Sequence, residues 1–193
     1  MSVLPSSGES SLARAGSPAL SSTARTVTNA LAVNAGWFAC VLGAAWGAPL
    51  AGPLAVAALL VLHWRLFRPA AGEWKLLAAA GLTGLVVDSA LGLSGLLVYT
   101  NGTAWLPWLA PLWLVALWVN LGTALNHCLG WLEGRPWLAS ALGAVGGSAA
   151  YFGGVRLGAL EFGHGTAAGV LVIAAVWAAV FPALYWLNGK LRG

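Results

Sequence analysis

Residues 166–188 read TAAGVLVIAAVWAAVFPALYWLN, a run without a single charged side chain. It exceeds the roughly 20 helical residues that cross a hydrocarbon core of about 30 Å. Similar apolar runs recur along all 193 residues, of which 60% are hydrophobic and only 7% charged. A soluble domain carries about 25% charged residues to keep its surface wet. The sequence therefore predicts an integral membrane protein.

The spanning elements are expected to be helices. Lipid offers no hydrogen-bond partners, so only helices or closed barrels cross it. Barrel strands alternate apolar and polar residues, whereas these runs are continuously apolar. We therefore predict an all-α fold, a compact bundle of six transmembrane helices. Their expected ranges are 27–46, 50–67, 74–99, 106–132, 136–160 and 166–188.

The N-terminal segment differs from the rest in composition. Residues 1–25 are rich in Ser, Ala and Pro, with too few large apolar side chains to order themselves, which predicts a disordered cytoplasmic tail. A cleaved signal peptide is the alternative, because Arg14 and Arg25 precede an apolar stretch. Residues 26–193 are then a single six-helix transmembrane domain.

The basic residues predict the orientation. Cytoplasmic loops of membrane proteins carry an excess of Lys and Arg. With six helices and the N-terminus inside, Arg156 alone of the nine basic residues lies near the far side. Both chain ends are then cytoplasmic. The eight residues on the cytoplasmic side are Arg14, Arg25, Arg65, Arg68, Lys75, Arg135, Lys190 and Arg192.

Small residues form stripes on the helices. A helical face of the third helix carries a set spaced by three or four residues, and the fifth helix repeats the pattern. Such stripes let membrane helices approach closely, and they also offer docking faces for a membrane protein partner. The two sets are Gly81, Gly84, Asp88, Gly92 and Gly95, and Gly143, Gly147, Gly154 and Gly158.

Asp88 lies within the glycine face of the third helix. An acid at that depth costs about 3 kcal/mol on insertion scales unless it is paired or neutralised. Asn120, at similar depth on the fourth helix, is its expected neighbour. Two interpretations remain open: a catalytic group facing a wet cavity, or a buried structural hydrogen bond.

A second group of polar residues is expected nearer the cytoplasmic side of the bundle. Asn120 and His127 share a face of the fourth helix, with Asn126 beside them, while His63 and Asn34 lie at a similar level on other helices. The set can line a cytoplasm-facing pocket, with His127 as a general acid or base and the others binding a ligand. The alternative is interhelical hydrogen bonding, worth about 0.6 kcal/mol a bond.

The sequence lacks the residues that a metal centre or a nucleotide-binding or hydrolase site would need. His164 is expected across the membrane from His63 and His127, so a histidine-rich di-iron centre lacks ligands. Glu161 and His164 have the spacing of half a carboxylate metal site, without a second half. They are expected near Arg156, a candidate external ligand-binding residue. The sequence predicts no metal site and no cofactor, and it shows no nucleotide or hydrolase motif and no basic stripe for nucleic acid.

Several segments resemble a known family. Residues 37–45 (WFACVLGAA), 84–88, 111–118 (PLWLVALW), 125–127, 131–132, 143–147 (GAVGG), Tyr151 and 156–160 (RLGAL) are similar, in order, to bacterial inner-membrane proteins of the domain-of-unknown-function 2878 family. The similarity covers residues 29–188. Ser148 stands where the family pattern has proline, and Cys128 where it has serine, which argues against a catalytic thiol. The resemblance implies a multi-pass protein of the bacterial inner membrane, in a setting similar to lipid-modifying systems.

Three functions are compatible with these observations. The first is a lipid-handling protein, enzyme or accessory, that holds a hydrophobic small molecule within the bundle. The second is a substrate-capture or transport subunit whose pocket opens outside, near Arg156, Glu161 and His164, an analogy of size and topology alone. The third is a structural subunit of a membrane complex. Whether the chain is an enzyme is left open.

Overall fold

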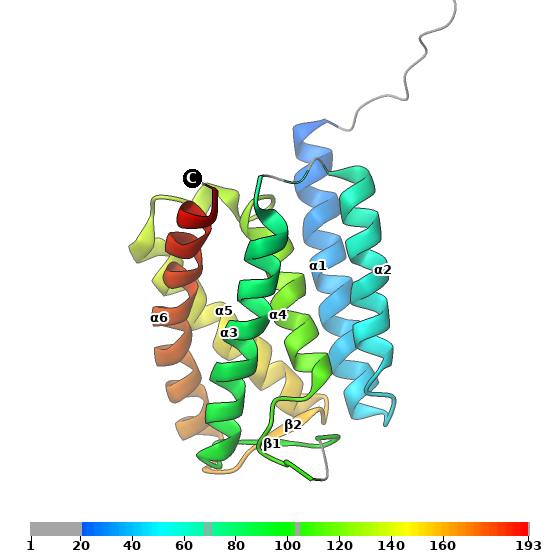
Figure 1. Cartoon of the computed structure of the whole chain (residues 1–193). Coiled ribbons are helices and arrows are strands. Elements are labelled where there is room, and N and C mark those ends of the chain that lie inside the picture. Colours follow the sequence, from blue (N-terminus) through cyan, green and yellow to red (C-terminus); the bar gives the residue numbers. More distant parts are fainter. Residues whose placement is uncertain (1–20, 68, 70, 103–104, 193) are drawn as a thin grey trace, which may run out of the picture.

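The structure, a computed structural model, describes residues 21–67, 69, 71–102 and 105–192. Within these residues the chain forms six α-helices, one 3-10 helix and a two-stranded sheet (Figure 1). The elements in chain order are α1 (Ser22–Ala45), α2 (Ala51–Leu66), α3 (Glu73–Leu93), β1 (Leu97–Tyr99), α4 (Leu112–Leu125), η1 (Gly130–Leu132), α5 (Pro136–Arg156), β2 (Leu160–Phe162) and α6 (Thr166–Arg192).

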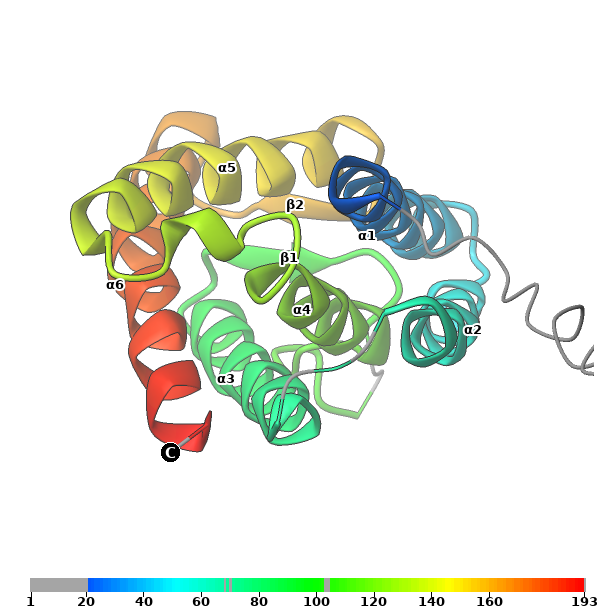
Figure 2. The same ribbon diagram turned by 90° about the horizontal axis from the view of Figure 1, so that it is seen from above.

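The central helix is α4, which packs against α1, α2 and α3 (Figure 2). Nine of its 14 residues are buried. It begins after Pro111, whose extended ψ of 155° excludes a continuing helix, and it ends at Asn126. At 1.5 Å per residue it is only about 21 Å long. The predicted helix 106–132 was therefore too long, because proline-containing turns and η1 replace both of its ends.

The remaining helices flank α4. α1 and α2 pack together on one side, while α5 packs on α6, which also contacts α3. Glycines make these approaches close: a Cβ at Gly84 would lie 2.1 Å from the Trp118 ring, and one at Gly147 would lie 2.3 Å from Trp177. The packing role predicted for these glycines is confirmed. Since their faces are covered by helices of this chain, docking of a partner through them stays a prediction.

A short hairpin closes one end of the bundle. β1 and β2 pair antiparallel, with Leu97 opposite Phe162 and Tyr99 opposite Leu160. The predicted helices 74–99 and 136–160 were too long, because Gly95 and Gly158 take positive φ values of 74° and 85° beyond the helix ends. These two glycines therefore make turns and do not belong to the helical stripes.

Both described chain ends lie at the end of the bundle opposite this hairpin (Figure 1). We call the two ends the terminal end and the hairpin end. α1 begins at Ser22, earlier than predicted, and the Ser21 hydroxyl caps it by accepting the Ala24 N–H at 3.2 Å. Residues 1–20, the main part of the predicted tail, lie outside the described residues.

Four helices are long and apolar enough to cross a membrane: α1, α3, α5 and α6. α2 and α4 are apolar but shorter. The outer faces of the long helices present exposed Leu31, Val86, Val145 and Leu171. Large apolar side chains are thus exposed on all four long helices, whereas a soluble protein rarely exposes large apolar patches. The fold is therefore that of a membrane protein with at least these four candidate spans.

Candidate functional site

Among the described residues, a partly open cavity of about 410 Å³ lies between α1, α4, α5 and α6. We call it the bundle cavity. Its lining is almost wholly apolar and rich in aromatic rings, with Asn120 and Tyr151 as its polar side chains apart from indoles. Besides Tyr151, the aromatic lining residues are Trp37, Trp113, Trp118, Trp131, Trp177 and Phe181.

The path of α5 accounts for this cavity. α5 runs obliquely across the bundle, from α6 at its start to α1 at its end (Figure 2). α5 packs tightly on both sides of its middle. A Cβ at Gly143 would clash with the Trp177 carbonyl oxygen, and a Cβ at Gly153 would lie 3.2 Å from the Trp37 ring. Between these two contacts, Gly146 lines the cavity with no atom within 4 Å of its Cβ position. The missing side chains of α5 thus leave space against α4.

Asp88 forms a separate polar cluster behind the cavity wall. Its carboxylate is fully buried, and it accepts hydrogen bonds from the Tyr151 hydroxyl at 2.5 Å and from the Trp118 indole N–H at 2.7 Å. The Tyr99 hydroxyl donates to the Asp88 carbonyl oxygen at 2.6 Å. Burial, and secondarily the nearby Asp88, raises the pKa of Tyr99 well above its usual value, so this hydroxyl keeps its proton.

The expected pairing of Asp88 with Asn120 was wrong. Asn120 donates instead to the Val33 carbonyl oxygen on α1 at 2.8 Å. Trp118 and Asn120 are two residues apart, or about 200° around a helix, so only one of them faces α3. Asp88 does not line the bundle cavity, although its partners Trp118 and Tyr151 do. Its carboxylate therefore orients part of the cavity wall.

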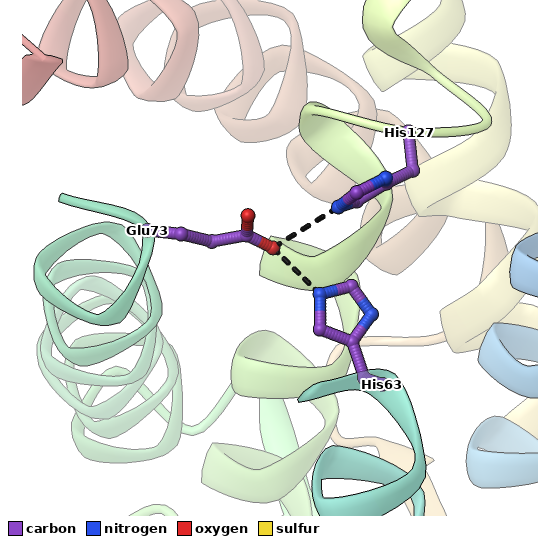
Figure 3. A group of neighbouring side chains, drawn as sticks. All are labelled: His63, Glu73 and His127. Carbon is purple, nitrogen blue, oxygen red and sulfur yellow. Dashed lines mark hydrogen bonds and ion pairs between the residues drawn. The ribbon is translucent and has the colours of Figure 1, made fainter. Parts of the chain in front are cut away.

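A third feature, the His–Glu cluster, consists of His63, Glu73 and His127 (Figure 3). The Nε2 atoms of both histidines point at the same carboxylate oxygen, Glu73 Oε1, at 2.7 Å from His63 and 3.3 Å from His127. His63 and Glu73 are buried, and His127 is 16% exposed. The candidate ligand atoms of the three residues all lie within 4.8 Å of one another.

Three elements meet at this cluster at the terminal end. His63 lies in the last turn of α2, Glu73 is the first residue of α3, and His127 follows α4. A carboxylate at a helix N-terminus is favoured by the exposed N–H groups there. Phe67 stacks on the His63 ring at 5.1 Å and also contacts the ring of His127. The rings are therefore held in place by packing.

Asn29 fixes the turn that carries His127. It is buried on α1, donates to the Thr123 carbonyl oxygen at 3.2 Å and accepts the Cys128 N–H at 3.1 Å. A small cavity of about 20 Å³ lies beside it, bordered by His63 and Thr123. That volume is room for about one water molecule.

The other predicted site residues lie apart from this cluster. Asn34 donates to the Ala30 carbonyl oxygen of its own helix, and Asn126 accepts hydrogen bonds from Asn188 and Arg192 of α6. Arg156 is exposed at the hairpin end, and the described residues hold no ion pair between it and Glu161. The structure thus unites His63 with His127 in one cluster and brings Asn120 to the small cavity that His63 borders, and the roles assigned to the seven predicted residues stay predictions.

Glu73 was missed by the sequence analysis, although a signal existed. It is one of only five acidic residues in the chain and follows His63 by ten positions. An up-and-down bundle brings the end of α2, the start of α3 and the end of α4 to one level. An acid at the start of the third helix therefore had to lie near His63 and His127.

Comparison with known proteins identifies one protein family that this chain matches. A family model described as "Protein of unknown function (DUF2878)" matches residues 26–183. No curated protein and no solved structure matches the chain. The matched residues run from α1 into α6, so they include the bundle cavity, Asp88 and the His–Glu cluster.

Proposed function

The chain belongs to the DUF2878 family of proteins of unknown function, and we propose that it is a multi-pass membrane protein that binds a hydrophobic small molecule inside its helix bundle. The ligand class is an acyl chain or a quinone-like molecule. The observation that carries this proposal is the bundle cavity. The family has no assigned activity, so the support for this proposal comes from the cavity and from the membrane orientation proposed with it.

All six helices cross the membrane in this proposal, with the terminal end in the cytoplasm. The support is the distribution of charge: of the described basic residues, only Arg156 lies at the hairpin end. An excess of Lys and Arg marks the cytoplasmic side, here the inner face of a bacterial inner membrane. α2 and α4 are short for a span, but α4 is surrounded by protein, where irregular backbone is tolerated. The residues at the terminal end are Arg25, Arg65, Lys75, Arg135, Lys190 and Arg192.

The cavity has the size and chemistry of a ligand site. Small-molecule pockets measure about 300–1,000 Å³ and combine an apolar lining with a few polar groups. The bundle cavity has about 410 Å³. Trp118 and Trp177 stack at 4.6 Å and provide a flat apolar wall. Asn120 and Tyr151 also line the cavity; the Asn120 amide offers a hydrogen-bonding group to a polar atom of the ligand, while the Tyr151 hydroxyl donates its proton to Asp88 and can only accept.

The opening of the cavity favours a ligand from the bilayer. Among its lining residues, Leu142 and Gly146 are exposed on the flank of α5, and Trp131 is exposed on η1. In the proposed orientation the two α5 positions face lipid, and Trp131 lies toward the cytoplasmic end of the bundle. The residues expected at an external opening, Arg156, Glu161 and His164, are not among the lining residues. A lipid-type molecule therefore fits the geometry better than a water-soluble ligand captured from outside.

The test fills the cavity from α5. We would purify the wild-type protein, Gly146→Leu and Ala149→Leu in lipid discs and identify the co-purifying small molecules by mass spectrometry. Gly146 lines the cavity with open space at its Cβ position, whereas Ala149 is exposed on the same helix and does not line it. A stoichiometric lipid or quinone is expected with the wild type and Ala149→Leu, and it is lost in Gly146→Leu.

Two outcomes would contradict this proposal. A water-soluble metabolite bound at stoichiometry would favour the substrate-capture subunit. Bulk lipid alone, equal in all three proteins, would leave the structural subunit as the explanation. Equal melting temperatures of the two variants would establish that a loss of ligand in Gly146→Leu is due to the filled cavity.

A further inference from the structure

We propose that His63, Glu73 and His127 form a binding site for a divalent transition-metal ion of the zinc or ferrous class. The site lies at the terminal end of the bundle, outside the bundle cavity, and none of its three residues lines that cavity. The proposal does not depend on the hydrophobic ligand proposed above.

The distances fit a metal centre after a small adjustment. Zinc binds histidine nitrogen and carboxylate oxygen at about 2.0–2.2 Å, so two tetrahedral ligands lie roughly 3.3 Å apart. The observed separations from Glu73 Oε1 are 2.7 Å for His63 Nε2 and 3.3 Å for His127 Nε2. All three ligand atoms lie within 4.8 Å of one another, so side-chain movements that shorten the longest separation by up to about 1.5 Å complete the geometry.

The convergence of the donors on one point is the second argument. Both imidazoles direct Nε2 to the same oxygen, while the other Glu73 oxygen points away from them (Figure 3). In the metal-free form Nε2–H groups donate to this oxygen; when an ion takes their place between the same three atoms, each imidazole carries its proton on Nδ1 and stays neutral. Two histidines and one carboxylate suit first-row divalent ions and leave coordination positions open for water or substrate.

The surroundings meet further requirements of a metal site. Phe67 holds the two rings, and Asn29 anchors the turn after α4, so little ordering is needed on binding. Glu73 is 1% exposed, and burial strengthens its attraction for a cation. The partial exposure of His127 provides an entry path from the terminal end.

A purely structural hydrogen-bonded triad is the competing explanation, and Glu73→Gln separates the two. The glutamine amide keeps the volume and an acceptor oxygen, so a hydrogen-bonded triad survives. Metal binding needs the charged carboxylate. Groups that merely orient a metal ligand account for about 10–100-fold in affinity, so loss of a ligand is expected to weaken binding by more than about 100-fold.

The experiment uses the full chain in lipid discs, purified through a tag without histidine. Metal content would be measured by inductively coupled plasma mass spectrometry under anaerobic conditions, and Co²⁺ would be titrated into chelator-treated protein by absorption spectroscopy. The variants are His63→Ala, His127→Ala and Glu73→Gln. The matched control is His164→Ala, the remaining histidine, which is exposed near the hairpin end.

About one ion per chain is expected in the wild type and in His164→Ala, with Co²⁺ affinity reduced more than about 100-fold in the three cluster variants. The identity of the ion then separates zinc from iron. A wild type without metal that gives no saturable Co²⁺ spectrum would overturn the proposal. Unchanged affinity in a Glu73→Gln protein that melts like the wild type would overturn it as well, even if the alanine variants fail to fold.

Discussion

Asp88 joins three helices and the hairpin, because buried side chains from α4, α5 and β1 each donate a hydrogen bond to it. Trp118 comes from α4, Tyr151 from α5 and Tyr99 from β1, and all three are buried around Asp88 on α3. A buried donor left without an acceptor costs about 1–3 kcal/mol. The carboxylate therefore stabilises the bundle whether or not it also takes part in chemistry.

Replacing Asp88 by alanine should destabilise the protein strongly. Asp88→Ala leaves the Trp118 N–H and the Tyr151 hydroxyl without their acceptor, so the free energy of unfolding should fall by about 2–6 kcal/mol. Asp88→Asn keeps one acceptor oxygen and the shape, and it should lose less. Denaturant or thermal melting in lipid discs would measure both, and an Asp88→Ala protein as stable as the wild type would refute the structural role.

Residue spacing on one helix predicted that Asp88 lies on the packed face of α3, where it is buried, but did not predict its partners. Which side chains of a neighbouring helix face Asp88 depends on how that helix is rotated about its axis. The spacing of residues on α3 carries no information about that rotation. Tyr151 is 63 positions from Asp88 in the chain. No local pattern joins them, so only the packed bundle reveals the pair.

Among the elements, the contact of α3 with α4 is set by Gly84. The Trp118 ring occupies the place where a side chain at Gly84 would be, with 2.1 Å to its Cβ position. The same ring carries the indole N–H bound to Asp88 and a wall of the bundle cavity. A change at this one glycine therefore acts on packing, on the buried acid and on the cavity together.

Gly84→Ala should weaken the bundle by about 1–3 kcal/mol, because the added methyl group forces the rigid Trp118 ring and its helix to move. Gly189→Ala is the control, since Gly189 on α6 has open space at its Cβ position. Gly189→Ala should not lower the free energy of unfolding, because alanine within a helix is about 0.5–1 kcal/mol more favourable than glycine. Melting temperatures in one detergent would compare them, and equal loss in both variants would argue against this steric account.

The helix ranges were predicted best where they depend on a single segment. α2, at 51–66, lies within one residue of its expected ends, and α6 begins where expected. The hairpin was missed, because Leu97–Tyr99 is a short apolar run that continues a helical one and Leu160–Phe162 is only three residues long, with Glu161 in its middle. Their strand conformation is stabilised by pairing with each other, across more than 60 positions of chain, and residue spacing within either run does not contain this pairing.

For the whole molecule, the termini at one end and the hairpin at the other give a testable orientation. In a variant lacking Cys40 and Cys128, single cysteines can be placed at Trp137, exposed at the start of α5, and at Val98, exposed on β1. An impermeant thiol reagent added to intact cells should label Val98→Cys and spare Trp137→Cys. Lysed cells should label both, and the reverse pattern would refute a cytoplasmic terminal end.

By itself, the sequence indicated a membrane protein, determined that it contains six apolar helices, and marked Asp88 and His63 as polar exceptions within them and His127 as one just beyond α4. These properties depend on composition and on residues within one segment, because the bilayer selects each helix by its length and hydrophobicity. Only the tertiary structure decided that Glu73 joins the two histidines, that Tyr151 and Trp118 satisfy Asp88, and that a cavity lies between α4 and α5. Those features arise from the rotation and tilt of whole helices, which result from all the contacts of the bundle at once.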